Sequence, residues 1–483
     1  MDWVWNEKRL KHDCNMPKLS LLPFFLELYT TGEMMKKLMI LSLITSIAAT
    51  SGFVFAQTAD SAKADGDAAA AAHAEEFTKL KGTVDGLNES FLETKNTVDK
   101  LAKIKVGGYL QIQWQHADSN AIENVAGGKF GGASNQRFQL RRGRLKTTYD
   151  AGTSQYILEF EARPSGVSLK DAEVVLKEPW LNSISATLGL MDRPFGFELA
   201  YSSSALESPE RTRVYQTLFK DEKDLGFKIE VNPSEQMGFL QYLNLKGGLY
   251  TGTGGFNGGN GDEIDSTTDF IGRAGFKAPF NDLNLAIDGG ISYYQGYLLG
   301  VNDTLYTMSG KALNSGLGAK NKTFDRNILG VDAQIYYSIP VIGDYLGGTS
   351  IRGEYLAGKN IGTIASSLPY GAASAPMAER NFMGWYVTWI QNWGTKLQSV
   401  LKYDEYDPNT DIEGSDVLVI ANGKLTATDL KYTTLGFGAN YFWDSNVKIS
   451  AYYDIVTNEK AFSGPFSSDL ADNILTLRAQ VKF

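Results

Sequence analysis

The sequence has few of the residues on which catalytic and metal sites most often depend. Its 483 residues include one cysteine, Cys14, and three histidines, His12, His73 and His116. Disulfides, thiolate nucleophiles and cysteine-ligated zinc are therefore excluded from most of the chain. A nucleophile also needs a neighbouring base, and His116 is the only histidine after residue 105. We expect no enzyme activity, no catalytic residue, no metal and no cofactor.

Proline, positive charge and overall hydrophobicity are also low. Thirteen prolines and 43% hydrophobic residues exclude a disordered chain, and a mean hydropathy of −0.22 excludes a bundle of apolar spanning helices. The 46 basic and 55 acidic residues give a net charge of −9, which argues against nucleic acid as a partner. Glycine is abundant at 50 residues and aromatic residues make up 12%, which favours β-structure.

The N-terminal region contains the pattern of an export signal. Two lysines precede an apolar run that ends in the small-residue cleavage site Val54-Phe55-Ala56. We expect a signal peptide over 34–56, an upstream extension from an early start codon over 1–33, and a linker over 57–74. A membrane anchor is the alternative for the apolar run, and its serines, threonines and glycine disfavour it.

Between residues 75 and 104, apolar residues recur at alternating spacings of three and four. They are Phe77, Leu80, Val84, Leu87, Phe91, Val98 and Leu101, with Thr94 in the same register. This heptad pattern predicts a short coiled-coil helix whose partner is another copy of the chain. A single amphipathic helix that packs on the following domain is the alternative.

From residue 105 onward, polar and apolar residues alternate, which predicts β-strands. Sixteen segments show this period: 106–117, 136–149, 154–164, 168–177, 183–192, 224–232, 237–251, 269–278, 283–296, 326–338, 346–357, 381–391, 395–406, 430–443, 446–457 and 473–483. In the last one, Leu475 and Leu477 share a face with Val481, whereas Arg478 and Gln480 lie on the other. An even number of strands with one apolar and one polar face is typical of a transmembrane barrel, and a soluble sandwich is the alternative.

The connections between these segments alternate in length. Every second one is short, such as 150–153 and 444–445, and the others are mostly long and rich in Gly, Ser and Asn, such as 193–223 and 297–325. Outer-membrane barrels have short periplasmic turns and long external loops. We therefore predict an all-β fold, a 16-stranded antiparallel transmembrane β-barrel over 105–483. It would lie in the outer membrane of a Gram-negative type cell, with the coiled coil over 75–104 in the periplasm.

The densest basic cluster on the predicted lumen face lies in the second strand. It contains Arg141, Arg142, Arg144 and Lys146, and the alternation slips by one residue between Leu140 and Gly143. Such a slip is typical of a β-bulge, which would turn Arg142, Arg144 and Lys146 into the lumen. There these cations can attract anions or pair with the carboxylates of the adjacent strand, and the two roles are compatible.

Four segments in order resemble the signatures of the phosphate-selective porin O and P family. They are 138–145 (FQLRRGRL), 189–196 (GLMDRPFG), 223–226 (KDLG) and 401–409 (LKYDEYDPN). The resemblance implies a trimeric outer-membrane channel with a periplasmic coiled coil, in which arginines and lysines attract anions. It also implies that Arg141, Arg142 and Arg144 lie near the constriction, and that the loop 193–223 folds inward.

We therefore expect a passive diffusion channel for small hydrophilic solutes that prefers anions such as phosphate. Its expected partners are two further copies of itself, outer-membrane lipid and small anions. The predicted anion pathway comprises Arg141, Arg142, Arg144, Lys146, Arg193 and Lys402, and the predicted lumen counter-charges are Glu159, Glu161, Asp171 and Glu173. The alternatives are an unselective general porin, and a structural protein or adhesin whose coiled coil spaces the barrel from the cell wall.

Overall fold

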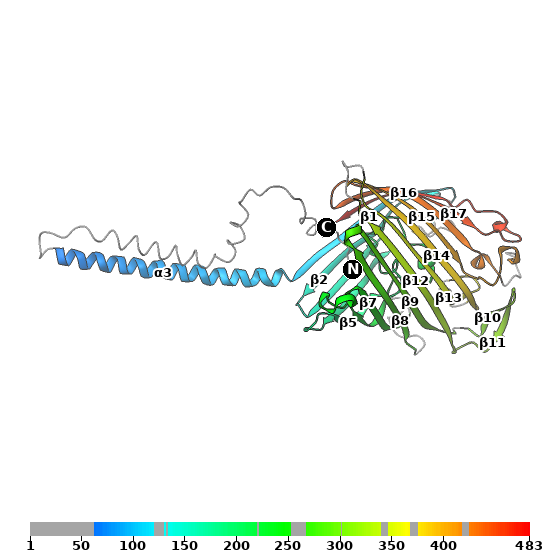
Figure 1. Ribbon diagram of the computed structural model, residues 1–483, viewed down its shortest axis with the longest axis horizontal. Helices are drawn as coiled ribbons and strands as arrows, with labels where there is room; N and C mark the ends of the chain where they lie inside the picture. Colours follow the sequence, from blue (N-terminus) through cyan, green and yellow to red (C-terminus); the bar gives the residue numbers. More distant parts are fainter. Residues whose placement is uncertain are drawn as a thin grey trace. The chain divides into compact units, whose positions relative to one another are not determined.

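A computed structural model describes residues 62–119, 130–131, 134–219, 222–252, 267–300, 302–339, 346–367, 375–417 and 425–483 (Figure 1). The chain divides into two compact units, Met1–Lys100 and Leu101–Phe483. The predicted extension over 1–33 and the predicted signal peptide over 34–56 lie outside the described residues.

The first unit contributes one long helix, α3, which spans Ala62–Leu101. It begins inside the segment predicted as a linker, because that segment is rich in alanine, the strongest helix former. The heptad residues are exposed in the single chain, from 54% at Val84 to 68% at Phe77. No helix of the described residues is long and apolar enough to cross a membrane.

The second unit is a closed antiparallel β-barrel of sixteen strands, as predicted from the sequence. Its strands are β1 Ile104–Ala117, β2 Gln136–Asp150, β3 Ser154–Arg163, β4 Gly166–Lys177, β5 Ile184–Asp192, β6 Lys223–Val231, β7 Leu243–Tyr250, β8 Asp269–Phe280, β9 Leu285–Leu299, β12 Thr323–Tyr337, β13 Thr349–Thr363, β14 Met377–Trp393, β15 Leu397–Asp407, β16 Tyr432–Phe442, β17 Val447–Asn458 and β18 Ile474–Lys482. Neighbouring strands pair in sequence order, except that β9 pairs directly with β12. The barrel closes where β18 pairs with β1, with Arg478 opposite Gln113.

The two remaining strands form a hairpin that the sequence did not predict. β10 (Thr304–Ser309) and β11 (Ala312–Leu317) lie in the connection 297–325, and β10 also pairs in parallel with the start of β14. A second difference lies before β7, where 237–242 forms 3₁₀ turns within η2, Glu235–Tyr242, in place of the predicted strand. Gly238 interrupts regular geometry there with a φ of 61°.

The barrel has a polar inside and an apolar outside. Along β1, Gln111 and Gln113 are each only 1% exposed. The residues that alternate with them, Leu110 and Ile112, are 37% and 48% exposed. The last strand shows the same alternation, with Thr476 and Arg478 buried and Leu477 exposed. This arrangement is the reverse of a soluble β-protein, in which the apolar face is covered.

The predicted β-bulge lies in β2. Gln111 of β1 pairs with Arg142 and the next residue, Ile112, pairs with Leu140, so Arg141 is the extra residue. A bulge re-aims side chains locally, so consecutive residues need not point to opposite faces of the sheet. The bulge thereby allows both Arg141 and Arg142 to bind the same carboxylate inside the barrel, that of Glu210.

Candidate functional site

The connection between β5 and β6, residues 193–222, folds into the barrel, and we call it L3. Lys220 and Asp221 lie outside the described residues. The other L3 residues contact lumen-facing groups on strands that are far apart around the barrel. The Gly196 amide donates to Ser292 Oγ of β9 at 2.9 Å, and Ser203 Oγ lies 2.7 Å from Tyr109 OH of β1. L3 therefore crosses the lumen, which confirms the expected inward folding of this loop.

A buried carboxylate on β13 anchors the first arm of L3, by which we mean the loop residues before Glu210. Glu354 accepts hydrogen bonds from the amides of Phe197 at 2.7 Å and Glu198 at 2.6 Å. The Tyr215 hydroxyl donates to it at 2.6 Å, and the Tyr386 hydroxyl of β14 donates to its other oxygen. One carboxylate thus joins two parts of the loop to two neighbouring strands.

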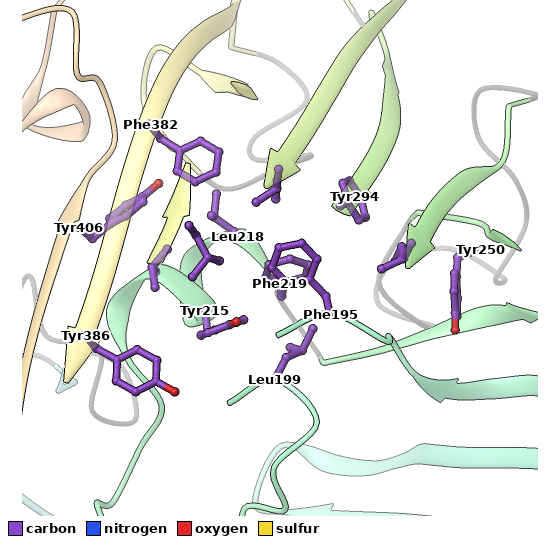
Figure 2. Close-up of a cluster of buried hydrophobic side chains, with 14 of the residues drawn as sticks. Phe195, Leu199, Tyr215, Leu218, Phe219, Tyr250, Tyr294, Phe382, Tyr386 and Tyr406 are labelled. Atoms are coloured by element: carbon purple, nitrogen blue, oxygen red, sulfur yellow. The ribbon is translucent and has the colours of Figure 1, made fainter. Parts of the chain in front are cut away.

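Aromatic and aliphatic packing holds the second arm of L3, by which we mean the loop residues after Glu210. This arm includes the short helix α4 (Arg213–Leu218). Figure 2 shows Phe195, Leu199, Tyr215, Leu218 and Phe219 of this loop gathered with side chains from the barrel wall. The wall contributes Met191, Tyr250, Ile271, Tyr294, Ile328, Leu356, Phe382, Tyr386 and Tyr406. All of these side chains are nearly inaccessible to solvent, so L3 has an apolar core of its own inside the barrel.

The middle of L3 carries a carboxylate, Glu210, that contacts three arginines. Arg141 binds it through both ends of its guanidinium, with Nε–Oε1 at 2.8 Å and Nη2–Oε2 at 2.9 Å. Arg142 Nη2 lies 2.8 Å from Oε2, and Arg478 Nη2 of β18 lies 2.7 Å from Oε1. The bulge in β2 and the closure of the barrel at β1 and β18 bring these three side chains together, because β1 lies between β2 and β18.

A second network of ion pairs runs along the wall beside L3, from β2 to β6. Arg144 contacts Glu161 at 2.6 Å and Glu159 at 3.1 Å, and it approaches Glu222 of L3 at 3.7 Å. The predicted pairing of the basic cluster with β3 is therefore confirmed for Arg144. The network continues through four further pairs: Lys146 with Glu159 and Asp171, and Lys223 with Asp171 and Asp192.

Of the two remaining predicted pathway residues, Lys402 contacts L3 and Arg193 is its first residue. Lys402 of β15 donates to the backbone oxygen of Glu210 at 3.0 Å and to Ser208 Oγ at 3.2 Å. Arg193 is buried at the start of L3, with its guanidinium carbon 5.5 Å from the centre of the Phe219 ring. Of the predicted counter-charges, Glu173 alone forms no ion pair with another described residue.

Sequence reasoning did not assign a site role to Glu210, Glu222, Arg211 or Arg478. Arg211 donates to the backbone oxygens of Glu198 and Tyr201 and pairs with Glu222, so it ties the two arms of L3 together. A signal for Arg478 was present, because it lies on the polar face of the last strand and a closed barrel must place that strand beside the first. The loop residues had no comparable signal.

The surrounding guanidiniums set the protonation of the L3 carboxylates. Burial by itself would raise the pKa of Glu210, but Arg141, Arg142 and Arg478 hold that pKa well below its usual range. Arg211 and Arg144 likewise outweigh burial and lower the pKa of Glu222. Both side chains therefore carry a full negative charge at neutral pH. Among the described residues, no group of three or more His, Cys, Asp or Glu side chains is placed to hold a metal ion.

No family model and no curated protein matches the sequence. Solved structures do match in fold. OprB of Pseudomonas putida is 11% identical, with a TM-score of 0.51 over 80% of this chain and 96% of that chain. The outer membrane channel DcaP of Acinetobacter baumannii is 13% identical, with a TM-score of 0.44 over 79% of this chain and 97% of that chain.

An anion-selective porin from Comamonas acidovorans is 12% identical, with a TM-score of 0.46 over 79% of this chain and 99% of that chain. At identities of 11–13% the similarity is one of fold, and of these three structures OprB has a TM-score above 0.5. That match agrees with the closed barrel, and the resemblance to the phosphate-selective porin O and P family stays a prediction.

Proposed function

We propose that the protein is an outer-membrane porin, a channel through which small hydrophilic solutes diffuse passively. The observation that carries this proposal is the closed sixteen-stranded barrel with its inverted faces. Exposed leucine, isoleucine and phenylalanine side chains around the outside match a hydrocarbon surrounding. A barrel of this size is too wide for its own strand side chains to fill, so water and solutes can enter its polar interior.

L3 is the element that narrows this pathway. It crosses the lumen and packs most densely against β7 to β9 and β12 to β15. On the opposite wall, the ion-pair network ends in side chains that keep contact with solvent, namely Lys146 at 43% and Asp192 at 41% exposure. We place the solute pathway between L3 and the wall formed by β2 to β5.

The charges along this pathway favour anions. The ion pairs that connect L3 with β2 to β6 and β18 contain eight cations, Arg141, Arg142, Arg144, Lys146, Arg163, Arg211, Lys223 and Arg478. They contain six carboxylates, Glu159, Glu161, Asp171, Asp192, Glu210 and Glu222. The excess of two positive charges in a low-dielectric wall raises the local concentration of anions, and guanidinium forks suit phosphate and other oxyanions.

The exposed heptad face of α3 supports a homotrimer. Its seven apolar side chains, from Phe77 to Leu101, have no cover in the single chain among the described residues. Identical seams from further copies would bury them. β1 begins at the end of the barrel where the short turns lie, and short turns are typical of the periplasmic end, so that end would face the periplasm.

A salt-gradient reversal potential measured across a planar lipid bilayer tests both the proposed conduction of solutes and the proposed preference for anions. The purified protein is expected to give an anion-selective potential, and Arg142→Ala and Arg144→Ala should each shift it toward cations. Arg380→Ala is the control, because Arg380 is a buried arginine paired with Asp429 outside this network. An equal shift in all three variants, or no shift in the first two, would remove Arg142 and Arg144 from the selectivity mechanism.

A further inference from the structure

Three arginines share the single carboxylate of Glu210, in a pocket that Asp404 and Asp454 also line. Three guanidiniums contact its carboxylate, and no other carboxylate of the described residues pairs with Arg141, Arg142 or Arg478. The Lys402 ammonium adds a further cation 3.0 Å from the backbone oxygen of Glu210. Each of the three arginines therefore has Glu210 as its one directly paired carboxylate among the described residues, while Glu222 acts on Arg142 and Asp454 acts on Arg478 from further away.

The donors around Glu210 are arranged as in a site for a free oxyanion. Oε1 accepts from Arg141 Nε and Arg478 Nη2, and Oε2 accepts from Arg141 Nη2 and Arg142 Nη2, all within 2.9 Å. Planar forks that converge on two oxygens are the usual way in which arginine binds carboxylate and phosphate groups. Among the described residues, Arg142 Nε is buried without a hydrogen-bond partner, so it can donate one further hydrogen bond at this place.

We propose that Arg141, Arg142 and Arg478 form an oxyanion-binding site in the lumen, and that Glu210 is a resident ligand that keeps it closed. The proposal rests on the porin function above, because a solute pathway is what brings free anions to these residues. A carboxylate or phosphate in transit must compete with a side chain tethered to the same loop. Glu210 therefore sets how tightly a passing anion is held, and its presence favours fast release over retention.

Another glutamate of L3 provides an internal comparison. Among the described residues, Glu207 pairs with a single arginine, Arg352 of β13, at 3.0 Å. The Arg352 guanidinium also lies over the rings of Phe197, Tyr201 and Tyr336, within 5.5 Å of each centre. Removal of the Glu207 charge leaves a single guanidinium that aromatic faces still stabilise. Removal of the Glu210 charge leaves three guanidiniums in contact with no carboxylate, which is costly until an anion from solution replaces it.

The test compares Glu210→Gln with the control Glu207→Gln in planar bilayers, with inorganic phosphate and succinate as probes added to chloride solution. In the wild-type channel we expect weak block by either probe. In Glu210→Gln we expect block at concentrations at least about tenfold lower, and a reversal potential that is more selective for anions. The Glu207→Gln channel should be blocked by phosphate and succinate at the same concentrations as the wild-type channel. Block by phosphate but not succinate would restrict the site to phosphate.

The outcomes separate this inference from the porin function. If the wild-type protein does not conduct, the porin proposal fails and takes this inference with it. If the wild type conducts and Glu210→Gln shows the same block as wild type or as Glu207→Gln, the oxyanion site alone is refuted. Should Glu210→Gln not assemble, Glu210→Asp keeps the charge but shortens the side chain by one methylene. It should give block of intermediate strength, and wild-type behaviour would refute the site.

Discussion

The docking of L3 depends on one glycine that has no room for a side chain. Gly196 adopts a φ of 60°, a conformation that L-residues with a Cβ rarely take. A Cβ at this position would overlap the Tyr215 hydroxyl and the Glu354 carboxylate, which form the hydrogen bond that joins the two arms of the loop to β13. Gly196→Ala must therefore both strain the backbone and displace this anchor.

The expected size of the effect follows from these two terms. A left-handed conformation costs a non-glycine residue about 1–2 kcal/mol, and a lost hydrogen bond to a charged group costs about 1.5–3 kcal/mol. Together they disfavour the docked loop by about 2.5–5 kcal/mol, enough to shift its equilibrium by roughly sixtyfold or more toward undocked states. We expect a larger single-channel conductance, and cleavage by trypsin after Arg211 or Arg213, which are buried in the docked loop.

A second glycine separates the two causes. Gly310, in the turn between β10 and β11, has the same φ of 60°, but nothing lies within 4 Å of a Cβ built there. Gly310→Ala carries the backbone strain alone, and we expect wild-type conductance and resistance to trypsin. If Gly196→Ala has the trypsin resistance and the single-channel conductance of the wild type, L3 does not depend on this contact.

Three further predictions concern lipid, pH and assembly. Leu477→Lys, on the exposed face of β18, should destabilise the barrel in a lipid bilayer by about 2–4 kcal/mol on urea unfolding, whereas Gln480→Lys on the buried face should cost clearly less. Because the pKa of Glu210 is lowered in the folded protein, its contribution is complete above the unfolded value of about 4.3 and is lost only as pH falls through the lower folded value. Pepsin should therefore cleave L3 only below about pH 4, and cleavage already at pH 5 would contradict the pairing. Leu87→Asp in the heptad seam of α3 should abolish trimers in chemical cross-linking while the barrel still folds; retained trimers would refute association through the helix.

The barrel could be predicted from the sequence because its signal is local and repeated. Each strand alternates between a lipid face and a lumen face, and the slip between Leu140 and Gly143 was sufficient to place the bulge. The hairpin β10–β11 could not be predicted in the same way. Its second strand, with Leu313 buried between the exposed residues Ala312 and Asn314, offers only one covered apolar position, which is too short for the alternation to be distinguished from a loop.

The site could be predicted only in part. The basic cluster of β2 was evident, as was its pairing with β3, because both depend on neighbouring strands. The contacts of L3 depend on residues that are far apart in the chain, such as Glu210 and Arg478. A glutamate in a polar loop has no periodicity that indicates its partner, and three-dimensional closure of the barrel decides it. The structure thus adds to the predicted position of Arg142 near the constriction a loop carboxylate as its partner, which the sequence could not supply.

The central claim is that this barrel conducts solutes along a pathway that L3 narrows. Purified wild-type protein added to a planar lipid bilayer at neutral pH tests it most directly. A conducting barrel should give stepwise increases in current, with three sublevels in each step if the barrels assemble as trimers. Insertion of folded protein without any conductance step would contradict it, and would leave the barrel as a structural or adhesive protein.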